Sequence, residues 1–97
     1  MDEFRGKYIT IMGLGLHGGG IASARFFAKA GAEVTVTDLR DEKTLSPAIH
    51  ELQGLPIRYV LGRHEIEDFA HADLVIKNPA VRRDSPYLAY AKRIETD

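Results

Sequence analysis

Five glycines occupy eight positions between Gly13 and Gly20, and their spacing is the first feature of this sequence that could do chemistry. Gly13, Gly15 and Gly18 form a G-x-G-x-x-G pattern, which permits a tight turn, close approach of backbone to a ligand, and close packing of a following helix. The free N–H groups of that helix's first turn, at the positive end of its dipole, favour a phosphate group. The segment therefore predicts a diphosphate site. The alternative is a glycine-rich turn that serves packing alone.

Two further segments carry polar side chains that a ligand could reach. Asp38 follows Gly18 by 20 residues and ends an apolar run, where an acid in such folds accepts a hydrogen bond from a ribose hydroxyl. Arg40 could contact a base or a phosphate, and Asn78 with Pro79 ends another apolar run. Each of these side chains also has a simpler interpretation, as a solvated group at a strand end or in a loop.

Alternating strands and helices must position these segments. Apolar, β-branched runs predict strands at 7–12, 33–38, 56–62 and 73–78, with the beginning of a fifth at 94–97. Helical patterns lie between them: from about His17 to Gly31, from a Thr44 cap to about Gln53, one or two turns within 65–72, and a helix with Ser85 as cap and Pro86 at its first position. This alternation predicts an α/β, Rossmann-like domain, a parallel sheet of four to five strands with helices on both faces.

Composition narrows the classes of protein that fit. A chain of 97 residues with 44% hydrophobic content supports one compact domain, so residues 1–97 are predicted to form a single nucleotide-binding unit. Lys and Arg number 13 against 14 Asp and Glu, and no long run of one sign occurs, which argues against a nucleic-acid partner. The absence of cysteine excludes disulfide frameworks and thiolate metal sites. With no long apolar stretch and no leader pattern, we expect no membrane association and a cytoplasmic location.

Residues that could carry catalysis are absent or isolated. His50, His64 and His71 lack metal-ligand spacing, no Walker A sequence occurs, and no nucleophile has an adjacent base. We therefore predict no catalytic residue and no metal site in this chain. Because the sequence stops within the last strand-like run, we also expect it to be a fragment of a longer protein.

Three segments together resemble a known family. Residues 6–40, 72–81 and 85–88 closely resemble the N-terminal domain of bacterial Mur ligases, in the branch that adds D-glutamate. The resemblance covers nearly the whole chain. Its most specific parts are the G-L-G-L-x-G loop, the Asp-x-Arg after the second strand and the Asn-Pro after the fourth.

The resemblance implies a role in peptidoglycan synthesis. In this family the N-terminal domain holds the UDP of a UDP-linked muramoyl precursor, a central domain carries the ATP site, and a third domain helps to bind the amino acid. The full enzyme would use ATP and Mg²⁺ to form an acyl phosphate that the amine of D-glutamate attacks. None of that chemistry lies in these residues, so the chain alone is expected to need no cofactor and to bind without turnover.

The resemblance also implies a set of UDP-binding residues. The backbone around Leu16 and His17 would meet the diphosphate, and residues 38–40 would surround the uracil. Two positions depart from the family pattern, since His17 replaces a small hydroxyl residue and Ala80 replaces glycine. The full predicted set is Gly13, Gly15, Leu16, His17, Gly18, Asp38, Leu39, Arg40, Asn78, Pro79 and Ala80.

Two other interpretations stay open at the level of sequence. An NAD-binding domain of a dehydrogenase or a regulatory sensor would fit the glycine pattern and Asp38 equally well, because an acid at that strand end favours NAD over NADP. Against it, a full dinucleotide site takes two βαβαβ halves and this chain supplies about one. The other interpretation is an independent α/β domain whose glycine turn binds nothing.

Overall fold

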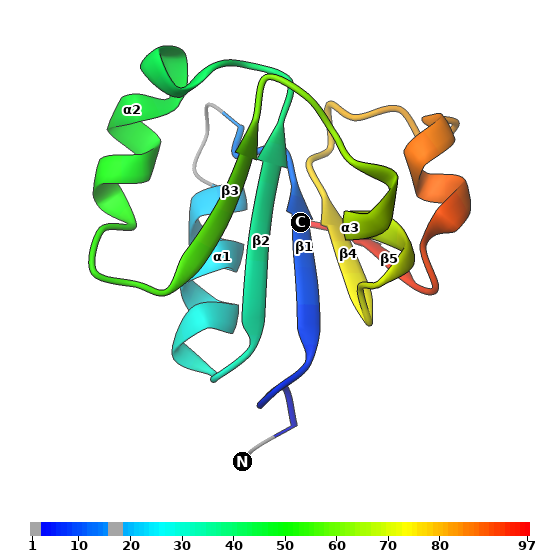
Figure 1. The fold of residues 1–97 in the computed structure, drawn as a ribbon, viewed down its shortest axis with the longest axis horizontal. Helices are drawn as coiled ribbons and strands as arrows, with labels where there is room; N and C mark the ends of the chain where they lie inside the picture. The colour runs from blue at the N-terminus through cyan, green and yellow to red at the C-terminus, as the bar shows by residue number, and fades with distance from the viewer. Residues whose placement is uncertain (1–2, 16–18) are drawn as a thin grey trace.

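In the computed structural model, which describes residues 3–15 and 19–97, five parallel strands form one sheet (Figure 1). Each pair of neighbouring strands is parallel, and the central strand pairs on both sides, so that Ile9 lies opposite Val34 on one side and Leu74 on the other. The predicted Rossmann-like parallel sheet is confirmed. The strands are β1 (Tyr8–Met12), β2 (Glu33–Asp38), β3 (Ile57–Leu61), β4 (Leu74–Lys77) and β5 (Ile94–Thr96), in the order β3-β2-β1-β4-β5.

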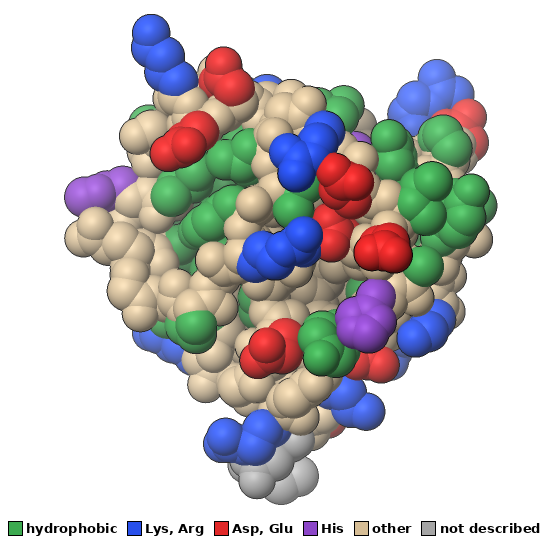
Figure 2. Space-filling model, viewed as in Figure 1, with side chains coloured by type: hydrophobic (Ala, Val, Ile, Leu, Met, Phe, Trp, Pro, Cys, Tyr) green, Lys and Arg blue, Asp and Glu red, His purple; other side chains and the backbone are tan. Residues whose placement is uncertain are grey.

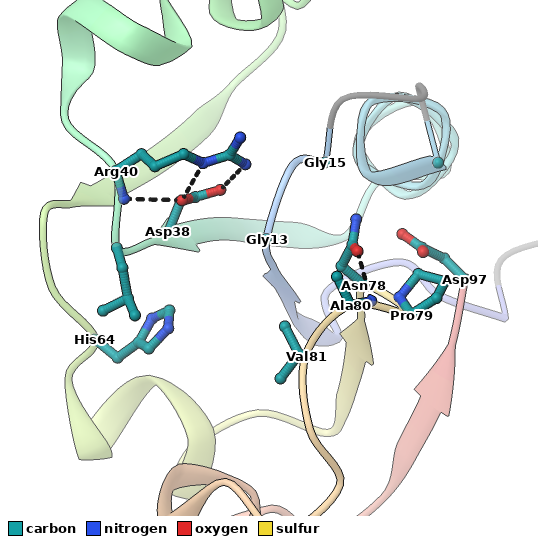
Figure 3. A pocket seen from close by; sticks show the side chains of 12 residues that line it. Gly13, Gly15, Asp38, Arg40, His64, Asn78, Pro79, Ala80, Val81 and Asp97 are labelled. Carbon is teal, nitrogen blue, oxygen red and sulfur yellow. Dashed lines mark hydrogen bonds and ion pairs between the residues drawn. The ribbon is translucent and has the colours of Figure 1, made fainter.

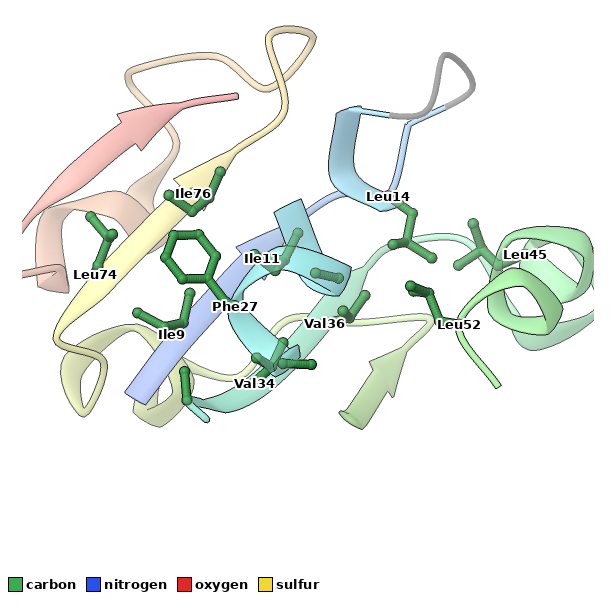
Figure 4. Packing of buried hydrophobic residues seen from close by; sticks show 13 residues of the cluster. Ile9, Ile11, Leu14, Phe27, Val34, Val36, Leu45, Leu52, Leu74 and Ile76 are labelled. Carbon is green, nitrogen blue, oxygen red and sulfur yellow. The ribbon is translucent and has the colours of Figure 1, made fainter. Parts of the chain in front are cut away.

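Helical segments cover both faces of the sheet, as predicted. Successive side chains of a strand point to opposite faces. Ile9 and Ile11 of β1 therefore pack in a cluster with α1 (Gly19–Lys29) and α2 (Glu42–Glu51), as Figure 4 shows. Met12 instead joins a second cluster, with Phe69 of α3 (Ile66–Ala70) and Leu88 of the 3-10 helix η1 (Pro86–Tyr90). Two apolar layers thus hold the central strand, and the carboxyl ends of the strands meet at one edge.

The contact of α1 with the loop after β1 leaves no room for a side chain. A Cβ added at Gly20 would lie 2.5 Å from the Leu14 carbonyl oxygen and 2.6 Å from that of Gly13. Gly18, to which the sequence pattern gives the close-packing role, lies outside the described residues, as do Leu16 and His17. Within the described residues, Gly20 is the glycine that permits the close approach of helix and strand.

The start of one helix and the type and length of another differ from the sequence-based expectation. The cap of α2 is Asp41 rather than Thr44, because the Asp41 carboxylate accepts a 2.9 Å hydrogen bond from the Thr44 N–H, which places Thr44 inside the first turn. Ser85 lies at the start of η1 but makes no capping hydrogen bond with its side chain, and the expected helix is a 3-10 segment of five residues. Ala91 is already extended there, because the chain must enter β5 at Ile94.

The surface carries mixed charge. On the face shown in Figure 2, Lys and Arg side chains lie among Asp and Glu side chains, and neither sign forms a broad continuous area. Among the helices of the described part of the chain, none has both the length and the apolar content required to cross a membrane.

Replacement of Gly20 by alanine tests the close packing of α1. In an exposed helix interior, Gly→Ala stabilises by about 1 kcal/mol. Here we expect Gly20→Ala to destabilise by about 1–3 kcal/mol, because the new methyl group would overlap backbone atoms that have no free space behind them. Urea unfolding followed by circular dichroism measures the change. A stabilised Gly20→Ala variant would contradict the packing described.

Candidate functional site

A cavity of about 610 Å³ opens at the carboxyl edge of the sheet (Figure 3). It includes the ends of β1 and β4, between which the strand order reverses, and this is where ligands bind in open α/β sheets. Segments that follow each of the five strands contribute to its walls. The lining residues are Gly13, Gly15, Gly19, Asp38, Leu39, Arg40, His64, Asn78, Pro79, Ala80, Val81 and Asp97.

The glycine loop after β1 needs glycine for both conformation and space. Gly13 and Gly15 have φ angles of 91° and 74°, in the left-handed region that side chains rarely adopt. A Cβ added at Gly15 would lie only 2.2 Å from Nδ2 of Asn78, which follows β4. Between the two glycines, Leu14 buries its side chain completely in the α1 core cluster. The loop is therefore anchored to the core by Leu14, and at Gly15 it packs directly against the Asn78 side chain.

The carboxylate of Asp38 organises the opposite side of the cavity. It is 4% exposed and accepts four hydrogen bonds from the described residues. One comes from the Leu14 N–H at 3.0 Å, and three come from the N–H, Nε and Nη2 of Arg40 at 2.9, 3.0 and 2.8 Å. These four bonds fill the acceptor positions of a carboxylate. Asp38 therefore holds the glycine loop and the Arg40 side chain in place.

Electrostatics support the ionised form of this pair. Burial raises the pKa of the Asp38 carboxyl, but the hydrogen bonds from Arg40 and Leu14 outweigh burial and hold the pKa below its ordinary value. The hydrogen bond to Asp38 likewise raises the pKa of Arg40. Leu39, between them, is 66% exposed at the cavity wall, where it offers an apolar surface to a ligand.

The segment after β4 is a tight turn that is stabilised by hydrogen bonds within it and from Lys77. The Asn78 side chain accepts a 2.9 Å hydrogen bond from the Ala80 N–H, and the Asn78 carbonyl accepts one from the Val81 N–H. Lys77 is buried, and its Nζ donates to the carbonyls of Asn78 and Val81 at 3.3 and 2.8 Å. Ala80 has no positive φ, so alanine is unstrained there. The turn brings Asn78, Pro79 and Ala80 to the cavity.

Comparison with known proteins gives the family. Residues 7–97 match the family model described as Mur ligase MurD-like, N-terminal domain. The chain belongs to the MurD-like Mur ligases.

Relatives named UDP-N-acetylmuramoylalanine--D-glutamate ligase match along almost all of the chain. The protein of Borreliella burgdorferi (strain ATCC 35210) is 50% identical over 99 residues, which is 100% of this chain and 22% of the relative. Those of Treponema pallidum (strain Nichols) and Geobacter metallireducens are 52% and 53% identical, over 96% and 94% of this chain and 19% and 20% of their own length. The chain thus spans about a fifth of the length of the curated relatives it matches.

In this MurD-like domain, the described residues of the predicted site come together. Gly13, Gly15 and the segments 38–40 and 78–80 all line the one cavity. The predicted residues Leu16, His17 and Gly18 lie outside the described residues. The role of each lining residue in binding UDP stays a prediction.

Sequence reasoning missed four lining residues: Gly19, His64, Val81 and Asp97. His64 and Asp97 follow β3 and β5, so the rule that strands deliver side chains at their carboxyl ends could have found them. The spacing of His64 in the sequence excluded a metal ligand and gave it no other role; within the described residues no group of three or more His, Asp or Glu side chains could hold a metal ion.

Asp97 gives the cavity an unsatisfied acid. Both of its carboxylate oxygens are buried and have no hydrogen-bond partner among the described residues. In Figure 3 the carboxylate points toward the start of α1, where a Cβ added at Gly19 would lie 3.2 Å from Oδ1. Burial raises the pKa of Asp97, and the charge of Lys77 opposes this shift.

The Asp38 network predicts a pH-dependent contribution to stability. We expect Asp38→Asn to destabilise the domain by about 1–3 kcal/mol at pH 7, because hydrogen bonds to a charged acceptor are lost. Since the folded pKa of Asp38 lies below the ordinary 3.8, this contribution is complete well above pH 3.8 and is lost as the pH falls through the folded pKa.

Urea unfolding of both proteins from pH 7 down to pH 3 checks this dependence. Asp84→Asn is the matched control, because Asp84 and its partner Arg82 are both largely exposed and such pairs contribute little. A difference between wild type and Asp38→Asn that stays constant across this range would contradict the role of the ionised carboxylate.

Proposed function

We propose that this chain is the UDP-binding module of a ligase that attaches D-glutamate to UDP-N-acetylmuramoyl-L-alanine in peptidoglycan synthesis. The observation that carries the proposal is the convergence of three separate segments on one cavity. The parts most specific to the family are the glycine loop, Asp38 with Arg40, and Asn78 with Pro79, and each of them contributes described residues to the lining. Relatives that bear the ligase's name match over almost the whole chain.

The charges and shape of the cavity fit a uridine diphosphate. Its diphosphate would lie against the glycine loop and the first turn of α1, an 11-residue helix whose N-terminus favours anions. Its base would lie against Leu39 and Arg40. The Nη1 of Arg40 makes no hydrogen bond within the described residues, so it is available to a carbonyl oxygen of the ligand.

NAD fits the same cavity less well. In an NAD site the acid at the end of the second strand accepts hydrogen bonds from ribose hydroxyls. Here the acceptor positions of Asp38 are filled by Leu14 and Arg40. A ribose hydroxyl would have to displace one of them. Asp38 is thus proposed to act on the ligand through the groups that it positions.

Ligation itself is proposed to depend on parts of the protein beyond this domain. ATP and Mg²⁺ would bind to the central domain and the amino acid to a third domain, while this module holds the UDP end of the precursor. The module would orient the precursor so that its terminal carboxylate reaches those domains. On its own it would bind without turnover.

Parallel amide-resolved NMR titrations with UDP, UDP-N-acetylmuramoyl-L-alanine and NAD test the proposal. We expect both uridine ligands to shift the amides of Gly13, Gly15 and residues 38–40, and to bind more tightly than NAD. Tighter binding of NAD would overturn the proposal. If none of the three ligands binds, the glycine loop would be interpreted as a turn that serves packing alone.

A pair of glycine variants sharpens this test. Gly15→Ala should weaken UDP binding about tenfold or more, because its Cβ would displace Asn78 at the cavity wall. Gly54→Ala is the control, since Gly54 has a similar φ of 87° but an added Cβ meets nothing within 4 Å. The Gly54→Ala variant therefore has the backbone strain of a positive φ but no steric clash with a neighbouring side chain. Equal UDP affinity in the two variants would argue against contact at Gly15.

Asp97 should oppose the binding of a diphosphate. Its carboxylate points to the start of α1, where the proposed anion lies. We expect Asp97→Asn to tighten UDP binding about three- to tenfold, as removal of one nearby like charge predicts. Glu95→Gln is the control, because it removes one charge from an exposed side chain paired with Arg93. Isothermal titration calorimetry at constant salt measures both, and equal affinities would exclude the repulsion.

A further inference from the structure

His64 lies in the cavity wall without a role in the site described so far. It follows β3 and lines the cavity together with Leu39 and Arg40. Figure 3 shows His64 and Arg40 on the same side of the cavity, across from Asn78 and Val81. The His64 ring packs edge-on against Phe69 and Tyr87, with ring centroids 5.8 and 5.1 Å away. Its orientation is therefore fixed by packing.

The hydrogen bonds of Thr37 determine which ring nitrogen carries the proton. The Thr37 hydroxyl is fully buried and donates its one hydrogen to the Arg63 carbonyl at 3.1 Å. Its oxygen lies 2.7 Å from Nδ1 of His64. Because a hydroxyl has one hydrogen, both contacts are hydrogen bonds only when Nδ1–H donates to the Thr37 oxygen. The second nitrogen, Nε2, then carries a lone pair, and it has no partner among the described residues.

The neutral ring is the favoured form. Burial lowers the pKa of His64, while the charges of Asp38 and Asp68 oppose that shift without cancelling it. At pH 7 the cavity wall therefore presents a hydrogen-bond acceptor, Nε2 of His64, and a donor, Nη1 of Arg40. A uracil ring has a matching edge, with N3–H as donor and a carbonyl oxygen on each side. Cytosine has the same shape but an acceptor at N3.

We propose that His64 is a specificity-determining residue that accepts a hydrogen bond from N3–H of uracil and thereby selects uridine over cytidine nucleotides. The inference rests on the proposed function of the cavity. Leu39 and Arg40 alone would make no hydrogen bond to N3–H of uracil, because neither side chain has an acceptor. Thr37 acts through His64 by holding its Nδ1–H.

The test is a comparison of UDP and CDP binding by the 97-residue chain and its variants. We expect the wild type to prefer UDP by about tenfold, as one hydrogen bond and one acceptor clash imply. In His64→Phe, which keeps an aromatic ring but no acceptor, the ratio should fall to about two. In His64→Gln, whose amide oxygen can replace Nε2 as acceptor, most of the preference should return.

His71→Phe is the matched control, because the His71 ring packs at a tilt against Tyr8 outside this cavity and its replacement should leave the ratio unchanged. An unchanged preference for UDP in His64→Phe would overturn the inference while leaving the proposed function intact. Failure of the wild type to bind UDP would instead overturn the proposed function.

Nitrogen-15 NMR of the wild-type histidine rings gives a readout that needs no variant. Addition of UDP should move the Nε2 resonance of His64 upfield, because a lone pair becomes hydrogen-bonded, and CDP should not. Equal shifts with both nucleotides, or none with saturating UDP, would contradict the proposed contact.

Discussion

The carboxylate of Asp38 joins two loops that would otherwise be independent. It stands at the end of β2, beside β1, and binds the Leu14 N–H of one loop and the Arg40 side chain of the other. Burying a charge is costly unless it is fully hydrogen-bonded, and here its four acceptor positions are filled. The Leu14 backbone and the Arg40 side chain are therefore positioned by contacts within the protein itself, as a preformed site requires.

Close backbone approach is the second constraint on the cavity. Its two central strands, β1 and β4, are neighbours in space although more than sixty residues separate them, because the chain returns across the sheet after β3. In the loops after these strands, the Gly15 backbone packs directly against the Asn78 side chain. The start of α1 packs against the first loop at Gly20. Lys77 adds a buried cation that binds the carbonyls of the second loop. The missing side chains at Gly15 and Gly20 thus allow the loops and α1 to pack closely beside the cavity.

Membership of the MurD-like family and the geometry of the cavity support a proposed division of roles between domains. This domain would hold one end of a long precursor, and ligation would take place elsewhere in the protein. Its selectivity is proposed to depend on a few directed groups: Arg40 as donor, His64 as acceptor, and the helix start as anion site. The acid at Asp97 is proposed to oppose the last of these, so that the net affinity for a diphosphate would be a balance between dipole and charge.

The sequence alone determined the fold class, the strands to within one or two residues, and most of the described cavity residues. It could do so because those features are local: apolar runs end at Asp38 and Asn78, and glycines stand where a strand meets a helix. It was wrong about the cap of α2, where Asp41 and not Thr44 accepts the capping hydrogen bond. It was also wrong about the length of the segment after Ser85, which ends early because the chain enters β5. Only the tertiary structure showed that Asp38 is saturated by Leu14 and Arg40, and that Thr37 orients His64 in the cavity wall. Those contacts join atoms from segments that are far apart in the sequence, and a local pattern of residue types does not predict which of those atoms meet.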